Sequence, residues 1–181
     1  GIYDAMNKGL EKASGDYVLF MNAGDLLFDS TTLEKIFSGN LNADVYYGHT
    51  QIIDLKGNVI GDKRQKPPKN LNWKSLKFGM CVSHQSFIAK RSLCDPYNLK
   101  YKLSADIDWV IRVLKKAKTI VNVNQTISKY LEGGASVKGR NVSLKERYKI
   151  MVDHYGFVTT FFNHVYITFR LIFQMISGKR K

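Results

Sequence analysis

The sequence has little of what marks several large classes of protein. Its 181 residues contain only two cysteines, Cys81 and Cys94, without Cys-x-x-Cys spacing, so neither a disulfide framework nor a zinc site is expected. A Walker-type phosphate loop, a Gly-x-Gly-x-x-Gly motif and a Gly-x-Ser-x-Gly elbow are also absent. No secretory signal is evident, because the first residues mix Asp4, Asn7 and Lys8 with apolar ones.

Acidic residues are scarce beside basic ones, 15 against 28, which gives a formal charge of +13. This balance favours an anionic partner such as nucleic acid, a phosphorylated substrate or an acidic lipid surface. A merely soluble basic protein would have the same charge. Nucleic acid is not expected, since the cations are dispersed and no recognition module is evident. Hydrophobic residues make up 44%, which is typical of one globular domain.

Helix and strand patterns alternate along the chain and predict a layered α/β fold. Residues 3–13 have helical periodicity, and the apolar run 17–21 follows after a short gap as a buried strand. A strand that is apolar along its length is typical of a sheet covered on both faces, so we expect a central sheet flanked by helices. Further strand patterns lie at 44–53, 82–89 and 119–123, and a capped helix pattern lies at 104–116.

The tail at 157–176 differs in kind, because it predicts an amphipathic helix that ends in Lys179-Arg180-Lys181. One face carries Val158, Phe161, Phe162, Val165, Phe169, Ile172, Phe173 and Ile176, and the other carries Thr160, Asn163, His164, Arg170 and Gln174. His164 and Arg170 argue against a membrane span and favour a helix lying in the membrane interface. A terminal helix packed on the domain or on a partner subunit is the alternative.

The strand at 17–21 runs directly into Asn22-Ala23-Gly24-Asp25, an amide, two very small residues and a carboxylate. At the end of a strand in an open α/β sheet, Asp25 can hold Mg²⁺ or Mn²⁺ while diphosphate oxygens fill the open positions of the metal. A simple turn or a helix-entry aspartate explains the same residues. On the residues alone, both interpretations stay open.

Two further groups can carry chemistry. Asp106 and Asp108 begin the helix at 104–116, where they either cap it and complement its dipole or supply a general base to a pocket. His84 and Gln85 interrupt an apolar stretch, which is compatible with a substrate contact or with a satisfied buried histidine. Cations that can meet phosphates, or simply face solvent, are Lys8, Lys138, Arg140 and Arg147.

Four motifs occur in order along the chain. They are 1-GIYDAMNKGLEKASGDYVLFMNAGD-25, 84-HQSFIAKRSL-93, 104-SADIDWVIR-112 and Gly133-Gly134-Ala135-Ser136. The first resembles the Ala-x-Asn-x-Gly helix, the strand and the DxD-type metal motif of family 2 glycosyltransferases. Together the motifs resemble that family up to about residue 150, and most closely its bacterial subgroup for capsule, O-antigen and colanic-acid-type polysaccharides.

The resemblance implies a GT-A fold, Rossmann-like with a mostly parallel central sheet, in residues 1–150, and a tail helix in 151–181. It implies an inverting transfer of a sugar from a nucleotide-sugar to a hydroxyl of a glycan acceptor, lipid-linked and at the cytoplasmic face of the membrane. The tail helix would then bind an anionic membrane surface. The protein is accordingly expected to be a peripheral membrane enzyme.

The resemblance also implies roles for individual residues. Asp106 aligns with the catalytic base, and Asp25 with the ligand of a divalent cation, Mg or Mn. Donor or diphosphate contacts would come from Asn7, Lys8, Asn22 and Asp25, and acceptor-side or diphosphate contacts from His84, Gln85 and Asp108, the last of these in a supporting or structural place.

Two departures from the family pattern matter. Asn22 stands where the first acid of the metal motif is usual, and Gly24 replaces the middle one, so weakened metal binding is expected. The strands that carry nucleotide-base contacts in the family would precede Gly1, so an N-terminally incomplete fold is expected. A non-catalytic module that binds sugar nucleotides or membranes is the alternative function.

Overall fold

The structure is a computed structural model that describes residues 1–39, 42–63, 66–133 and 139–177. Its helices are α1 (Ile2–Lys12), α2 (Thr32–Phe37), α3 (Ala105–Lys116), α5 (Arg140–Tyr155) and α6 (Phe157–Ile176). Its strands are β1 (Tyr17–Val18), β2 (Leu26–Leu27), β3 (Val45–Ile53), β4 (Val59–Asp62), β5 (Phe87–Lys90) and β6 (Ile120–Leu131). Short 3₁₀ helices are η1 (Trp73–Phe78), η2 (His84–Ser86) and η3 (Arg91–Leu93).

In the described residues, six strands form one sheet in the order β1-β5-β3-β6-β2, and β4 pairs with β3. The expected α/β class is confirmed. The expectation of a mostly parallel sheet is wrong in detail, because β3 and β6 pair in parallel whereas the β1–β5, β3–β5, β3–β4 and β2–β6 ladders are antiparallel. β5 enters between β1 and β3 in the reverse direction, and an apolar run in a sequence carries no sign of its direction.

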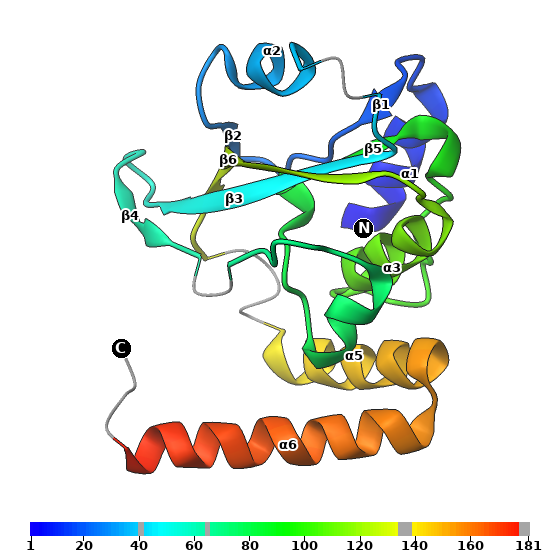
Figure 1. Ribbon diagram of the computed structural model, residues 1–181, viewed down its shortest axis with the longest axis vertical. Coiled ribbons are helices and arrows are strands. Elements are labelled where there is room, and N and C mark those ends of the chain that lie inside the picture. Colours follow the sequence, from blue (N-terminus) through cyan, green and yellow to red (C-terminus); the bar gives the residue numbers. More distant parts are fainter. Residues whose placement is uncertain (40–41, 64–65, 134–138, 178–181) are drawn as a thin grey trace.

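Helices cover both faces of the sheet, with α2 on one side and α1 and α3 on the other (Figure 1). Alternate residues of β3 point to opposite faces, as the pleat of a strand requires. Tyr46 packs with Ile36 in the smaller core beneath α2. Val45 and Tyr47 pack with Trp109 of α3 in the larger core. This two-sided burial explains why the start of β3 carries apolar and aromatic side chains on both faces.

The indole of Trp109 fixes α3 against the sheet. Its ring lies 5.3 Å from that of Phe20, 5.9 Å from Phe87 and 5.3 Å from Tyr97, between ring centroids. Its Nε1 donates a hydrogen bond of 2.9 Å to the carbonyl of Asp95, so the polar atom of a fully buried ring is satisfied. The start of α3 is thereby held at one edge of the sheet.

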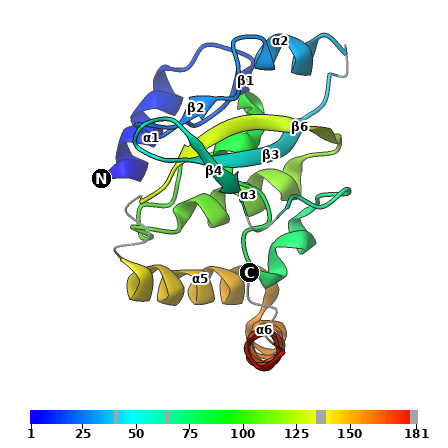
Figure 2. The same cartoon turned by 90° about the vertical axis from the view of Figure 1, so that its left-hand side faces the viewer.

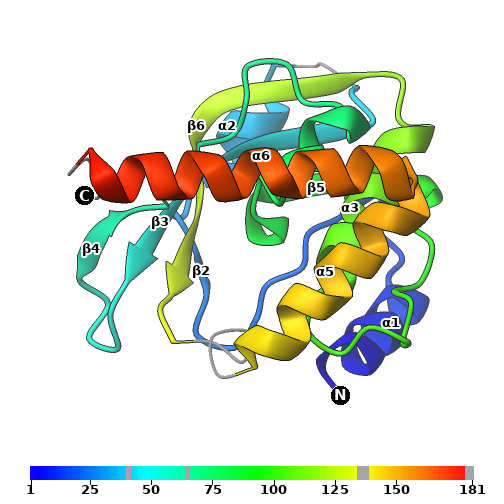
Figure 3. The same ribbon diagram turned by 90° about the horizontal axis from the view of Figure 1, so that it is seen from below.

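Beyond α3, helices α5 and α6 form a further layer (Figure 2). The expected division between residues 150 and 151 falls inside α5, and both Ile150 and Met151 are buried in the larger core. The tail is helical as expected, and α6 crosses the underside of the domain (Figure 3). In the part of the chain that the structure describes, no helix combines the length and apolarity that a membrane span requires.

Part of the polar face of helix α6 packs inward, whereas Arg170 of that face is exposed. Thr160 is 1% exposed, and the Asn163 amide donates a hydrogen bond of 3.3 Å to the carbonyl of Lys77 in η1. His164 contacts the ring of Tyr148 in α5, with centroids 5.0 Å apart. The apolar side faces outward, and its exposed residues are Phe157, Val158, Phe161, Phe162, Tyr166, Phe169, Ile172, Phe173 and Met175. This arrangement is the reverse of an ordinary surface helix.

Candidate active site

A cleft of about 1090 Å³ opens at the edge of the sheet where β1, β3 and β6 end and where β5 begins. Loops at the ends of strands converge at such an edge, where open α/β sheets bind their ligands. Asn22, Asp25, His84, Gln85 and Asp106 all line this cleft. These five expected site residues, drawn from three separate segments of the chain, therefore meet in one place.

The carboxylate of Asp25 stabilises the turn that follows β1 through hydrogen bonds. Its Oδ2 accepts hydrogen bonds from the backbone N–H of Asn22 at 3.2 Å and from Gln85 Nε2 at 2.8 Å. Its Oδ1 accepts from the backbone N–H of Leu131 at 3.0 Å. The carboxylate thus joins the ends of β1 and β6 to the start of β5. Asp25 therefore stabilises a turn and also lines the cleft, and its place as a metal ligand stays a prediction.

Gly24 allows this turn to form. Its φ of +91° lies in the left-handed region that side chains rarely adopt. A Cβ at this position would lie 2.5 Å from Leu131 Cδ2, well inside van der Waals contact. The small residue between Asn22 and Asp25 is therefore required both by the backbone conformation and by the close approach of β6.

A chain of polar contacts links the turn to α3. Asn22 Nδ2 lies 3.3 Å from His84 Nε2. His84 Nδ1 lies 3.5 Å from Asp106 Oδ2. The hydroxyl of Tyr3 donates to Asp106 Oδ1 at 3.3 Å. Donors on two sides therefore hold the Asp106 carboxylate in one orientation.

The Asp106 carboxylate stays ionised although it is largely enclosed. Its side chain is 20% exposed. Burial works to raise its pKa, but the hydrogen bond and charge of His84, the charge of Arg147 and the N–H of Ile107 outweigh burial and hold the pKa below the usual range. An ionised, oriented carboxylate on a cleft wall can accept a proton from a bound hydroxyl.

Asn7 and Lys8, expected on the donor side, do not line the cleft. Asn7 binds the backbone of Tyr97, donating from Nδ2 to the carbonyl at 3.0 Å and accepting from the N–H at 2.6 Å. Lys8 is exposed and pairs with Asp4 at 2.9 Å, one helical turn away. Asn7 therefore links α1 to the loop that contains Tyr97, because its side chain binds the backbone there and not a group in the cleft.

Asp108 also lies away from the cleft. Its contacts agree with the structural role that was one of the expectations for it. Its carboxylate pairs with Arg112 Nε at 2.9 Å and with His154 Nε2 at 2.8 Å, and its side chain is 9% exposed. Burial opposes ionisation of Asp108, yet the contacts with His154 and Arg112 hold its pKa below the usual range. Asp106 and Asp108 point in different directions from α3, so only one of them reaches the cleft.

The sequence motifs did not indicate Lys63, which directly follows β4. Its backbone N–H donates to the carbonyl of Thr50 at 3.1 Å, and its Nζ donates to Ser83 Oγ at 2.9 Å. The ammonium also lies 4.6 Å from the centroid of the Tyr130 ring. Lys63 and Arg147 both line the cleft, although nothing in their spacing from Asp106 indicates it.

The residues of the cleft do not form a ready site for a divalent cation. Mg²⁺ and Mn²⁺ prefer several oxygen ligands, whereas both oxygens of Asp25 already accept hydrogen bonds. Asn22 places a neutral amide where an acid would be needed. Among the described residues, no group of three or more His, Cys, Asp or Glu side chains could hold a metal ion. The expected cation therefore stays a prediction.

Some expectations fall on residues outside the described ranges. These are Gly134, Ala135 and Ser136 of the fourth motif, Lys138, and the basic residues Lys179, Arg180 and Lys181. Gly133, the first residue of the motif, lines the cleft beside Glu132. Arg140, another expected phosphate contact, begins α5 and does not line the cleft.

Solved structures identify the class of fold. The chain is similar to the crystal structure of S. aureus TarS 1-349, with a TM-score of 0.58 and 14% identity over 86% of this chain and 46% of that one. It is also similar to S. aureus TarS 1-349 in complex with UDP, with a TM-score of 0.55 and 13% identity over 82% of this chain and 43% of that one. The architecture is therefore the GT-A glycosyltransferase fold.

The sequence places the chain within that class. The model of the family described as Glycosyl transferase family 2 matches residues 1–95, and the chain belongs to this family. It is 30% identical over 144 residues to the "PGL/p-HBAD biosynthesis glycosyltransferase" of Mycobacterium bovis and to that of Mycobacterium tuberculosis. The match covers 74% of this chain and 52% of each relative, so the chain spans about half the length of these curated relatives.

Proposed function

We propose that the cleft transfers a sugar from a nucleotide-sugar donor to a hydroxyl of a glycan acceptor, with inversion at the anomeric carbon. The observation that carries this proposal is the Asp106 carboxylate, which is ionised and held on the cleft wall by His84 and Tyr3. Membership of the family supports the glycosyltransferase class.

Asp106 acts as the general base in this proposal. As the acceptor oxygen attacks, its proton passes to a carboxylate oxygen, and the carboxylate needs no reorganisation because His84 and Tyr3 already orient it. His84 is in turn held by Asn22. The Asn22 amide, which stands where the family usually has an acid, therefore helps to position Asp106. Asp106 touches the substrate, whereas His84 and Asn22 are positioning residues.

Inversion follows from a single displacement. The acceptor oxygen attacks the anomeric carbon on the face opposite the diphosphate, the new carbon–oxygen bond forms, and the bond to the phosphate oxygen breaks with its electron pair. The cleft offers a base for this step, and the proposal needs no covalent sugar–enzyme intermediate. The described residues Asn22, Asp25 and Gln85 would then face the donor, with His84 between them and the base.

Relatives support the substrate classes. One structural neighbour is a complex with UDP, which supports a nucleotide-sugar donor. The mycobacterial relatives are named as glycosyltransferases of PGL/p-HBAD biosynthesis, which supports a biosynthetic transfer. For the acceptor, we propose a lipid-linked glycan of a bacterial surface polysaccharide, such as capsule or O-antigen.

Enzymes of the family commonly use divalent cations. If this chain uses Mg²⁺ or Mn²⁺, Asp25 is the residue that would hold it, with diphosphate oxygens and water as the remaining ligands. The ion would offset negative charge on the diphosphate. No step of the proposed transfer depends on it, because the proton and the electron pair move between the acceptor, the sugar and Asp106.

We also propose that α6 binds an anionic membrane surface, which would place the enzyme at the inner face of the cytoplasmic membrane. The support is the inverted packing of the helix, which leaves large aromatic side chains such as Phe162, Phe169 and Phe173 between 64% and 71% exposed. Close to the start of α6, Lys145 and Lys149 of α5 line a groove together with Phe157. Cations beside an apolar face suit acidic lipid headgroups.

A transfer assay tests the function. The purified protein is incubated with UDP- and GDP-sugars and a lipid-linked glycan acceptor, with and without Mn²⁺, and the product is analysed by NMR for its anomeric configuration. The proposal predicts a glycosidic product inverted relative to the donor. A product that retains the configuration of the donor would contradict the single displacement, and donor binding without turnover would favour the non-catalytic module.

A further inference from the structure

Among the described residues, four cations line the cleft without an ion-pair partner, and of these Lys63 and Arg147 are half-buried whereas Lys102 and Arg170 are exposed. The ion pairs of the described residues, with nitrogen and oxygen within 4.0 Å, include neither Lys63 nor Arg147. The Lys63 ammonium contacts the Ser83 hydroxyl and the Tyr130 ring. Burial lowers the pKa of Lys63, an effect that the nearby charges of Asp106 and Asp25 oppose.

Arg147 is even less satisfied. It enters the cleft from α5, and its Nε is buried without a hydrogen-bond partner in the described part of the chain. Lys63 and Arg147 both line the cleft, and the charge of Arg147 contributes to lowering the pKa of Lys63. A buried donor that lacks a partner costs free energy, and two cations that repel each other cost more. A ligand that brings negative charge and acceptor oxygens would remove both costs.

The ligand must carry several acceptor oxygens in a compact group. Lys63 follows β4 and Arg147 lies on α5, so the two cations reach the cleft from separate elements. A diphosphate has oxygens on two phosphorus atoms and a charge that suits an ammonium and a guanidinium together. Asp25 and Asn22, by contrast, offer a poor set of ligands for a divalent cation.

We propose that Lys63 and Arg147 bind the donor diphosphate and balance its charge in the role that a divalent cation would otherwise have. This inference rests on the proposed function, because it names the part of the donor that these residues hold. When the bond between the sugar and the phosphate oxygen breaks, the electron pair stays on the diphosphate. The ammonium and the guanidinium stabilise the added negative charge, and the acceptor proton goes to Asp106.

Calorimetric titration with inorganic pyrophosphate in excess EDTA tests the inference without any nucleotide or sugar. The wild-type chain is expected to bind, and Lys63→Gln and Arg147→Gln are each expected to weaken binding about tenfold, as for the loss of one charge-assisted contact. Lys63→Arg retains the charge and should restore most of the affinity. The two substitutions lie on different elements, so the loss of fold in one leaves the other as a test.

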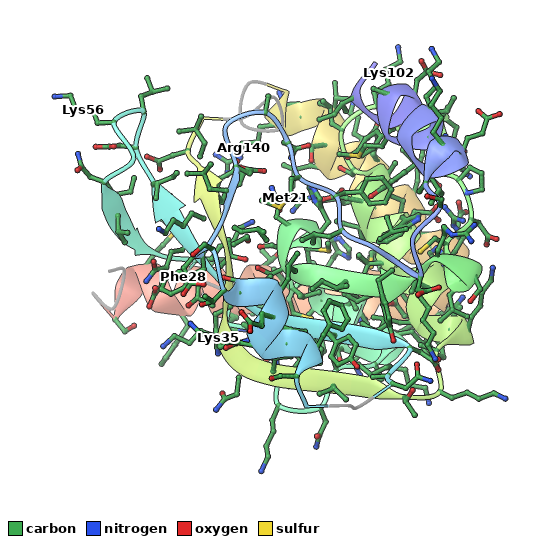
Figure 4. The ribbon with its side chains drawn as sticks, turned by 90° about the horizontal axis from the view of Figure 1, so that it is seen from above. Met21, Phe28, Lys35, Lys56, Lys102 and Arg140 are labelled. Carbon is green, nitrogen blue, oxygen red and sulfur yellow. The ribbon has the colours of Figure 1, made fainter. Side chains whose placement is uncertain are left out.

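Lys56→Gln is the matched control, because Lys56 lies at the tip of the β3–β4 hairpin and points away from the domain (Figure 4). It removes one positive charge without touching the cleft, and its affinity should equal that of the wild type. Equal affinity in all variants would overturn the inference, since binding would then reflect the general positive charge. Binding that requires Mn²⁺ and is lost in Asp25→Asn would overturn it as well.

The outcome separates this inference from the proposed function. Glycosyl transfer that needs Mn²⁺, without pyrophosphate binding in EDTA, would overturn the role of Lys63 and Arg147 and leave the transfer intact. Pyrophosphate binding in EDTA that depends on both residues, without transfer from any nucleotide-sugar, would support the anion site and contradict the proposed function.

Discussion

His84 Nδ1 lies 3.5 Å from Asp106 Oδ2, and this contact joins η2, just before β5, to the start of α3. The imidazole both orients the carboxylate and lowers its pKa. Because Asn22 holds the opposite nitrogen of the ring, three residues from three segments act as one unit. Asn22, where the chain departs from the family pattern, is thereby connected through His84 to Asp106, the proposed base.

Replacement of His84 tests this unit. His84→Gln removes a contact that lowers the pKa of Asp106, so that pKa rises and the carboxylate takes up its proton at a higher pH. Since the base acts only when ionised, the acidic limb of the kcat profile moves to higher pH, while donor binding changes little. An acidic limb at the same pH in both proteins would contradict the positioning role.

Replacement of Gly24 tests the turn. Gly24→Ala adds both the cost of a positive φ and a clash with Leu131, and we expect a loss of about 2–4 kcal/mol in the free energy of unfolding. Gly57→Ala is the control, since Gly57 has a similar φ of +83° but open space around its Cβ position. If urea denaturation gives the same loss in the free energy of unfolding for both variants, the Leu131 side chain moves aside without a measurable energetic penalty.

Replacement of Asp108 separates structure from chemistry. Asp108→Asn leaves Arg112 and His154 without their shared carboxylate, and we expect a loss of about 2–4 kcal/mol in the free energy of unfolding. The fraction of the variant that stays folded should keep its specific activity. A stable variant without activity would place Asp108 in the reaction instead.

Substitution of the outer face of α6 tests the membrane proposal. Phe162→Ser with Phe169→Ser removes two of its exposed rings and should lower co-sedimentation with vesicles of anionic phospholipid by about tenfold or more. Leu99→Ser is the control, because Leu99 is 53% exposed and lies outside α6. Undiminished binding would indicate that α6 serves another partner.

Local patterns in the sequence predicted a large part of the fold. The helices at 3–13, 104–116 and 157–176 correspond to α1, α3 and α6, because helical periodicity and capping are properties of neighbouring residues. Strand direction was not predictable. The sequence at 82–89 has the same apolar character whether it runs with β3 or against it, and only packing in the sheet decided this.

The site was predicted only where motif and geometry coincide. Asp25 and Asp106 line the cleft as expected, because each follows or begins a regular element at the same edge of the sheet. Asn7 does not line the cleft, and its partner Tyr97 lies 90 residues away in the chain, so no local signal marks the contact. Lys63 was missed for the same reason, because its neighbours Ser83 and Tyr130 come from other segments.

The most direct test of the account is the turnover of Asp106→Asn under saturating donor, measured together with the Kd of the donor. The account predicts that kcat falls by about 10² to 10⁴, as for the loss of a general base, while the Kd and the thermal midpoint stay close to those of the wild type. Turnover by Asp106→Asn at the wild-type rate would contradict the central claim that this carboxylate is the base.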